Sequence, residues 1–282
     1  MFARLDSARS CEDRKAPVFP PSGELVTYHR CTRCGFIFCP DFDALSDAEM
    51  AELIYNDDYI RADPGFADER PRYFAKALIS LFAGLPRDVR ALDFGGGKGL
   101  LAQLLRASGS MDCYDSYDPY FDTGRVPNST YDIVTAFEVM EHSRDPLGTF
   151  RAARACLKPC GVLLFSTQLQ PPRVDAGWWY IAPRNGHFSI YSHASLRRLG
   201  RRLGMRTLSL NEGLHMMYAA EAAPLARAIA RNRSGAVLWC ASRCGPTAWA
   251  SAVASLARLG FVMPALNPRH LVRMLALSLR PG

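Results

Sequence analysis

The sequence predicts an α/β fold in which a mostly parallel β-sheet is flanked by helices, with a small cysteine-containing appendage before it and a helical extension after it. Short β-type runs alternate with segments whose apolar residues recur at helical spacing. Glycine- or proline-containing turns separate these runs. Strands that alternate with helices need crossover connections, and these place the helices on the faces of a parallel sheet. The 282 residues leave room for one such domain and smaller attachments.

Three regions are expected along the chain. Residues 1–62 are rich in prolines and cysteines and predict an irregular appendage. Residues 63–221 carry the alternating pattern of the core domain, and residues 222–282 predict two or three helices rich in Ala and Leu. The core is expected to contain a helix over 68–83, strands over 89–94 and 111–117 around a helix over 100–105, a strand over 131–137, a helix over 146–157, a turn over 158–161, a strand over 162–167, a long aromatic loop over 168–192, a helix over 194–203, and strands over 207–210 and 215–219.

The positive charge is concentrated in the last third of the chain. Residues 1–195 hold 21 basic and 25 acidic side chains, whereas residues 196–282 hold 13 Arg and only Glu212 and Glu221. Two interpretations stay open. The arginines either lie on solvated faces of amphipathic helices, or they attract an anionic membrane surface or an acidic substrate.

The sequence contains no apolar segment long enough to span a bilayer, and Met1–Lys15 does not resemble a signal peptide. A cytoplasmic protein is therefore expected, with peripheral membrane contact through the basic C-terminal region as an addition. The nine cysteines should then be thiols or metal ligands. No nucleic-acid partner is expected.

The most specific feature is the segment Asp93-Phe94-Gly95-Gly96-Gly97-Lys98-Gly99, which follows a β-type run. Glycines at this point let the chain turn tightly and approach a ligand, and the next helix offers free N–H groups. The dinucleotide fingerprint requires a third glycine or alanine where Leu100 stands, and a P-loop requires Ser or Thr after its Gly-Lys pair. Neither pattern is present, which leaves Asp-x-Gly-x-Gly-x-Gly or a purely structural turn.

This pattern resembles the first motif of the class I S-adenosylmethionine-dependent methyltransferases. The resemblance covers roughly residues 68–219 and implies a Rossmann-like domain. It implies that the loop holds the amino-acid part of S-adenosylmethionine, with Asp93 near the ammonium group and backbone N–H groups near the carboxylate. The implied contacts in this segment are Asp93, Gly95, Gly96, Gly97 and Gly99.

Two further segments are similar to motifs of this family. Asp118 ends the second strand, where an acidic side chain would accept hydrogen bonds from ribose hydroxyls, although Asp115 is a rival. Residues 131–142 are similar to the fourth-strand motif, which adds Phe137 and Glu138 to the expected cofactor contacts. Only about a dozen residues separate Asp118 from Tyr131, so the usual third strand and its adenine-side acidic residue are missing. Phe121 or a backbone amide would substitute.

Two histidines are the candidate catalytic residues. His142 follows the fourth-strand motif and would face the methyl group, where it is either a general base or a capping, structural histidine. His187 lies in the aromatic loop near Arg184, which either grips a polar, sugar-like or anionic substrate or forms an ordered lid packed by its own Trp residues.

Cys31 and Cys34 form a Cys-x-x-Cys pair, which is half of a tetrahedral zinc site. Some members of the group, including sugar C-methyltransferases, have an N-terminal zinc-binding segment with two such pairs. Here Cys11 alone stands where the first pair would be, and Cys39 or His29 could complete the set. A zinc site of Cys11, Cys31 and Cys34 and a metal-free remnant both remain open.

The sequence thus predicts an S-adenosylmethionine-dependent methyltransferase that acts on a small-molecule or glycan-type acceptor. A non-catalytic member that binds the cofactor or a membrane surface is the alternative. An NAD-dependent oxidoreductase is a third hypothesis, which the Leu100 mismatch disfavours.

Overall fold

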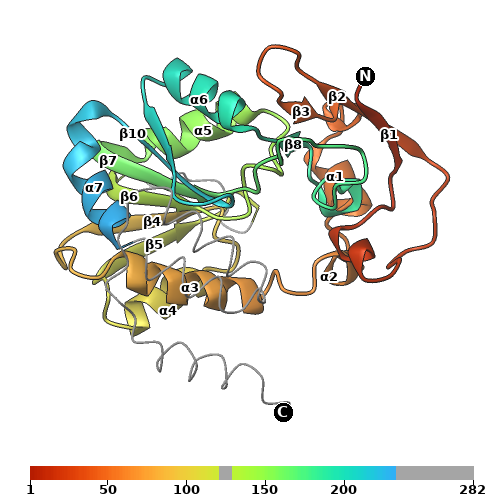
Figure 1. Ribbon diagram of the computed structural model, residues 1–282. Helices are drawn as coiled ribbons and strands as arrows, with labels where there is room; N and C mark the ends of the chain where they lie inside the picture. The colour runs from red at the N-terminus through yellow and green to blue at the C-terminus, as the bar shows by residue number, and fades with distance from the viewer. Residues whose placement is uncertain (121–128, 233–282) are drawn as a thin grey trace, which may run out of the picture. The chain divides into compact units, whose positions relative to one another are not determined.

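The computed structural model describes residues 1–120 and 129–232, which all belong to one compact unit, Met1–Ala236 (Figure 1). The strands are β1 (Ala3–Asp6), β2 (Leu25–Arg30), β3 (Ile37–Phe38), β4 (Arg90–Phe94), β5 (Cys113–Tyr117), β6 (Tyr131–Ala136), β7 (Leu157–Ser166), β8 (Ser189–Ile190), β9 (Arg206–Ser209) and β10 (Leu214–Tyr218). The α-helices are α1 (Asp47–Leu53), α2 (Tyr59–Ala62), α3 (Glu69–Leu81), α4 (Leu100–Ala107), α5 (Pro146–Ala155), α6 (His193–Arg202) and α7 (Ala223–Arg231), with short 3-10 turns at Cys11–Arg14, Pro40–Phe42, Pro183–Asn185 and Ala220–Ala222.

The larger sheet has six strands in the order β5-β4-β6-β7-β10-β9. The first four strands run parallel, and β10 pairs antiparallel with both β7 and β9. This mostly parallel sheet, flanked by helices, confirms the predicted fold class. Residues 121–128, between β5 and β6, lie outside the described residues, so the expected lack of a third strand and the expected adenine contact of Phe121 stay predictions.

Alternate residues of the central strands pack into two cores, one on each face of the sheet. Ala91, Ile133 and Leu164 pack in a cluster with side chains of α3, α4 and α7. Leu92 and Val134 pack in the other cluster with side chains of α5 and α6. Figure 1 shows α3 and α4 on one side of the sheet and α5 and α6 on the other. Because side chains alternate along a strand, strands covered on both faces read as continuous apolar runs.

The N-terminal region is more regular than the sequence predicted. It forms an antiparallel sheet of order β1-β2-β3-β8, whose last strand comes from the predicted aromatic loop. Strands β3 and β8 have two residues each, too few for a detectable alternation. The consequence is that residues 189–190 are joined to the N-terminal region through backbone hydrogen bonds.

Two other differences concern element boundaries. The predicted turn at 158–161 lies inside β7, where the register with β6 shifts between Tyr131 and Ile133, so these residues form an irregularity within a strand. Of the helices predicted for 222–282, α7 is present, and the remainder lies outside the described residues. In the part of the chain that the structure describes, no helix has the length and apolar character needed to cross a membrane.

Candidate functional site

The glycine turn between β4 and α4 has the backbone that its sequence predicts. Gly95, Gly97 and Gly99 have φ values of +76°, +54° and +75°, in the left-handed region that favours glycine. The N–H groups of Gly95 and Gly96 both donate to the Tyr117 carbonyl, at 2.7 and 3.2 Å. The loop is therefore held against the end of β5.

The space around these glycines differs from one to the next. A Cβ built on Gly95 would lie 2.5 Å from Cγ2 of Val139, and one on Gly96 would collide with the Ser116 hydroxyl. A Cβ on Gly97 would meet nothing within 4 Å. Gly97 thus turns its bare face toward open space, as a backbone cradle for a ligand requires.

Asp93 lies at the end of β4 with 3% of its surface exposed. The Thr135 hydroxyl donates to its Oδ1 at 3.0 Å. Burial, with a contribution from Asp118, raises the pKa of Asp93 to about 7. A cation placed beside this buried carboxyl would favour its ionised form.

Asp118 directly follows β5 and is also buried, with 7% exposure. The Gly97 N–H donates to its Oδ2, and the Tyr120 N–H donates to its Oδ1, both at 2.9 Å. The structure therefore brings this carboxylate and the glycine loop together at the carboxyl edge of two neighbouring parallel strands, where ligands bind in open α/β sheets. Its rival Asp115 instead accepts a hydrogen bond from the Tyr131 hydroxyl.

Phe137 and Glu138 follow β6 and point in different directions. The Phe137 ring lies parallel to that of Phe74 on α3, with centroids 4.4 Å apart, inside the core. Glu138 has φ of +57° and is, among the described residues, the only non-glycine residue with positive φ. The Ser166 hydroxyl accepts from its N–H at 2.8 Å and donates to its Oε1 at 2.9 Å. Such strain persists where surrounding contacts hold it, often at functional sites.

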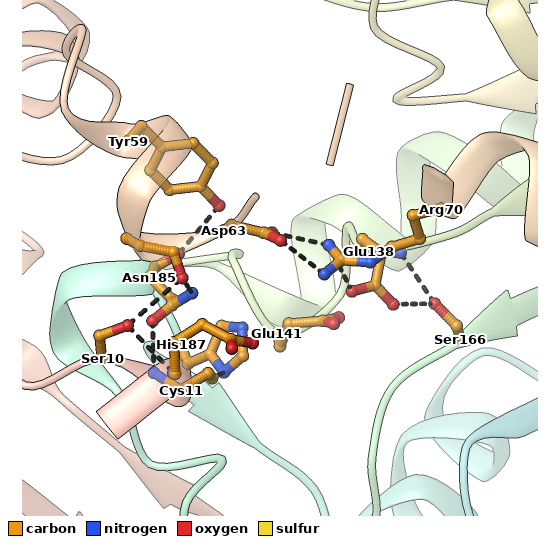
Figure 2. A network of polar contacts seen from close by, with 12 residues as sticks. Ser10, Cys11, Tyr59, Asp63, Arg70, Glu138, Glu141, Ser166, Asn185 and His187 are labelled. Carbon is orange, nitrogen blue, oxygen red and sulfur yellow. Dashed lines mark hydrogen bonds and ion pairs between the residues drawn. The ribbon is translucent and has the colours of Figure 1, made fainter. Parts of the chain in front are cut away.

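A partly buried ion network continues from Glu138 into the N-terminal region (Figure 2). Arg70 on α3 donates to both oxygens of Asp63 at 2.6 and 2.7 Å and pairs with Glu138 Oε2 at 3.1 Å. One guanidinium thus joins the segment after α2 to the end of β6. Neither Arg70 nor Asp63 can be recognised from the sequence, because the sequence around a charged residue does not reveal its ion-pair partner.

Glu141 lies beside this network and is fully buried. The Tyr180 hydroxyl donates to its Oε1 at 2.6 Å, whereas its Oε2 has no hydrogen-bond partner among the described residues. Burial and the nearby Glu138 raise the pKa of Glu141 to about 8. Sequence reasoning did not select Glu141, although it adjoins His142.

The structure brings the two predicted histidines together. The rings of His142 and His187 meet edge to face with centroids 5.0 Å apart. Burial, assisted by Arg70, lowers the pKa of His142 to about 4, and burial with His142 lowers that of His187 to about 3. His187 Nδ1 lies 2.8 Å from the Tyr180 carbonyl, which can only accept, so Nδ1 carries the proton and Nε2 has a free lone pair.

An open cavity of about 550 Å³ adjoins His142. Arg144 fixes its outer wall by donating to the carbonyls of Phe42 and Leu45 and by pairing with Asp47 at 3.0 Å. The lining comes from the N-terminal region, the end of β5 and the start of α5, and consists of Asp43, Leu45, Tyr120, His142, Ser143, Arg144, Asp145 and Thr149.

The aromatic loop is packed against the N-terminal region. The Arg184 guanidinium donates to the Ile54 carbonyl at 2.6 Å and to Asn56 Oδ1 at 2.8 Å. Asn185 accepts from the Cys11 N–H and donates to the Ala62 carbonyl, at 2.8 and 2.9 Å. Arg184 is therefore occupied by structural hydrogen bonds.

One of two sets of potential metal ligands has its side chains close enough together to hold an ion. Ligand atoms of Glu141, His142 and His187 all lie within 4.8 Å of one another, and this group is the one such cluster among the described residues. Cys11, Cys31 and Cys34 do not form a cluster of this kind, because Cys11 is buried with its Sγ 3.7 Å from His187 Nδ1. The arrangement of these cysteines does not fit a shared zinc site.

A glycine cradle after the first strand of a parallel sheet, with acidic residues at the ends of that strand and its neighbour, defines an α/β protein that binds a nucleoside cofactor. Residues 66–210 match the family model described as a methyltransferase domain, about half of the chain. The protein belongs to this methyltransferase family, which confirms the resemblance seen in the sequence.

Curated relatives match shorter stretches. The ubiquinone biosynthesis O-methyltransferase of Actinobacillus pleuropneumoniae serotype 7 is 49% identical over 105 residues, which span 28% of this chain and 45% of the relative. The protein of the same name from Xanthomonas campestris pv. campestris (strain B100) is 31% identical over 117 residues, 39% of this chain and 49% of the relative. The chain spans less than half the length of these relatives.

Solved structures with weak similarity include an O-methyltransferase family protein from Burkholderia thailandensis, with 17% identity, a TM-score of 0.41 and coverage of 56% of this chain and 60% of that one. An O-methyltransferase from neocarzinostatin biosynthesis, solved with S-adenosyl-L-homocysteine and 1,4-dihydroxy-2-naphthoic acid, has 14% identity, a TM-score of 0.41 and coverage of 64% and 63%. Scores this low do not bear on function.

Proposed function

We propose that this protein transfers a methyl group from S-adenosylmethionine to a polar small-molecule or glycan-type acceptor. The observation that carries the proposal is Gly97, whose N–H binds Asp118 while its α-carbon faces open space. In this proposal Asp93 binds the cofactor ammonium group, the loop N–H groups bind its carboxylate and Asp118 binds the ribose hydroxyls. When bound, the cofactor supplies a methyl group on a positively charged sulfur.

The cavity beside His142 is the proposed acceptor site. Tyr120 in its wall lies two residues after Asp118, which joins the cavity to the cofactor site. Its lining includes two carboxylates, those of Asp43 and Asp145, and one guanidinium, that of Arg144. This acidic surplus favours neutral or positively charged acceptors with hydroxyl or amine groups and disfavours anionic ones.

His142 and His187 have separate proposed roles in the transfer. His142 lines the cavity and is neutral at pH 7, so it can accept the proton that the acceptor loses. His187 touches the His142 ring, and its Nδ1 is held by the Tyr180 carbonyl, so it positions His142. Zinc has no part in the proposal, because Cys11, Cys31 and Cys34 do not form one ligand cluster.

Calorimetric titration with S-adenosylhomocysteine tests the cofactor site. Wild-type protein should bind it, and Asp118→Asn should weaken binding at least tenfold, since hydrogen bonds to a charged group are worth about 1.5–3 kcal/mol. Asp112→Asn is the matched control, because Asp112 is exposed and lies beside Arg87 at 3.8 Å. Absence of binding by folded wild-type protein would refute the proposal.

Transfer itself is tested with S-adenosylmethionine labelled in the methyl group and a pool of cellular small molecules and glycans. Label should enter neutral or cationic products, and His142→Gln should slow its entry by about 100-fold or more. If cofactor binds and no label is transferred to any acceptor, the protein is the non-catalytic cofactor-binding member considered from the sequence.

A further inference from the structure

Seven exposed arginines lie on helix α6 and on the two segments that flank its ends. Arg197, Arg198, Arg201 and Arg202 occupy α6, and Arg206 begins the next strand. Arg30 and Arg33 lie at the Cys31–Cys34 turn between β2 and β3. In the described part of the chain none of the seven forms an ion pair or a side-chain hydrogen bond with a protein group.

The Cys31–Cys34 turn packs against the start of α6. The Ser192 hydroxyl, which caps α6, donates to the Cys34 carbonyl at 2.5 Å. A Cβ built on Gly35 would lie 3.5 Å from Ser192 Oγ and 3.7 Å from an Arg30 guanidinium nitrogen. The charge of Arg198 also acts on both thiols of the turn. The arginines of the turn and of the helix therefore share one surface, which we call the α6 basic face.

The α6 basic face has a rigid base. Leu196 is buried in the core on that side of the sheet, and a Cβ on Gly200 would collide with the Thr207 hydroxyl on β9. Arginines spaced three and four residues apart repel one another across an exposed helix, which destabilises it slightly. Close to the helix, Glu212 contacts His193 at 3.8 Å, and the arginines are left without a carboxylate partner among the described residues.

We propose that the α6 basic face binds the surface of an anionic lipid bilayer. Several guanidinium groups on one rigid helix can contact many lipid phosphate groups at once. Each arginine near an anionic bilayer surface strengthens the electrostatic attraction to it. Residues 233–282 carry six arginines and no acidic residue among apolar side chains, a composition typical of membrane-surface segments. Single-stranded nucleic acid fits less well, because α6 carries no Phe, Tyr or Trp on which bases could stack, and duplex DNA is the competing ligand in the test below.

Co-sedimentation of the full-length protein with vesicles tests the proposal. Vesicles of phosphatidylcholine with about one third phosphatidylglycerol should bind it, and pure phosphatidylcholine should not. Raising the salt concentration to about 0.5 M should release it. The double variant Arg198→Glu and Arg201→Glu should lower the partition coefficient at least about 25-fold, at roughly fivefold for each arginine.

The matched control is Arg227→Glu with Arg231→Glu on α7, which changes net charge equally on the opposite face of the sheet. It should lower partition by no more than about threefold, because charges beyond a Debye length are screened. Equal loss in both variants, or binding of wild-type protein to neutral vesicles, would overturn the proposal. So would a duplex DNA probe that binds more tightly than the anionic vesicles and loses binding with the α6 variant. S-adenosylhomocysteine affinity should stay unchanged in both variants, which separates this result from the proposed catalytic function.

Discussion

The N–H of Gly97 donates a hydrogen bond to Oδ2 of Asp118 across 2.9 Å. This bond ties the turn after β4 to the carboxylate after β5, so two parts of the candidate cofactor site hold each other in place. It also requires the left-handed backbone of Gly97, at φ +54°. Substitutions in the loop can therefore affect two separate quantities, the stability of the fold through backbone strain and the affinity for the cofactor through the loss of open space at the loop.

Gly97→Ala should leave the fold intact and weaken cofactor binding. The left-handed conformation costs a non-glycine residue about 1–2 kcal/mol, while the added methyl enters open space that the cofactor would fill. S-adenosylhomocysteine affinity should fall at least tenfold in calorimetry. Gly95→Ala should instead destabilise the fold by about 3 kcal/mol in urea unfolding, because its methyl also meets Val139. Wild-type affinity in Gly97→Ala would count against the cradle.

Arg70→Met should destabilise the protein by about 3 kcal/mol, since it leaves the carboxylates of Asp63 and Glu138 without their shared cation. Arg72→Met is the control on the same helix. Arg72 pairs with Asp68, both side chains are more than half exposed, and its loss should cost about 0.5 kcal/mol. Urea unfolding measures both. Similar losses in the two variants would show that the partly buried network contributes no more than a surface pair.

The stability of the cofactor-free protein should be greatest near pH 6.5. Burial raises the pKa of Asp93 to about 7 and that of Glu141 to about 8, so the folded state holds these protons longer, and stability falls as pH rises from about 4 to 8. Burial lowers the pKa of His142 and His215 to about 4 and, with His142, that of His187 to about 3, so stability falls as pH drops from 6.5.

Below pH 6.5 the three histidines outweigh the two carboxyls, and above it the carboxyls act alone. Each proton contributes a slope of about 1.4 kcal/mol per pH unit. Urea unfolding at a series of pH values measures the curve, and Glu141→Gln should make the decline above pH 6.5 shallower. An unchanged decline in this variant would contradict the raised pKa of Glu141.

Asn185→Ala should destabilise the contact between the aromatic loop and the N-terminal region. It leaves the Cys11 N–H buried without this acceptor and removes one of the two hydrogen bonds to the Ala62 carbonyl, which keeps only that from the Ser10 hydroxyl, at a cost of about 2 kcal/mol. Asn211→Ala, in the turn before β10, removes one hydrogen bond from the Gly213 N–H and should cost about 1 kcal/mol. Thermal unfolding compares the two. Equal melting temperatures would contradict the idea that Asn185 joins these segments.

Much of the core was predictable because its signals are local. The apolar run at residues 89–94 and the helical spacing of Phe74, Leu78 and Leu81 reflect which faces must be buried, and each is visible within a short window. The N-terminal sheet was not predictable, because β3 pairs with β8 from a distant loop and neither strand is long enough to show a pattern.

The candidate site likewise has parts that the sequence predicts and parts that only the folded structure reveals. The Asp93–Gly99 turn could be predicted from the sequence, because a left-handed backbone favours glycine whatever residues surround it. Only the tertiary structure revealed the remaining features of the site. These are the contact of His142 with His187, the Glu141 oxygen that has no hydrogen-bond partner among the described residues, and the ion pairs that join Asp63 and Glu138 through Arg70. These groups are far apart in the chain, and burial and charge pairing depend on neighbours that sequence spacing does not name.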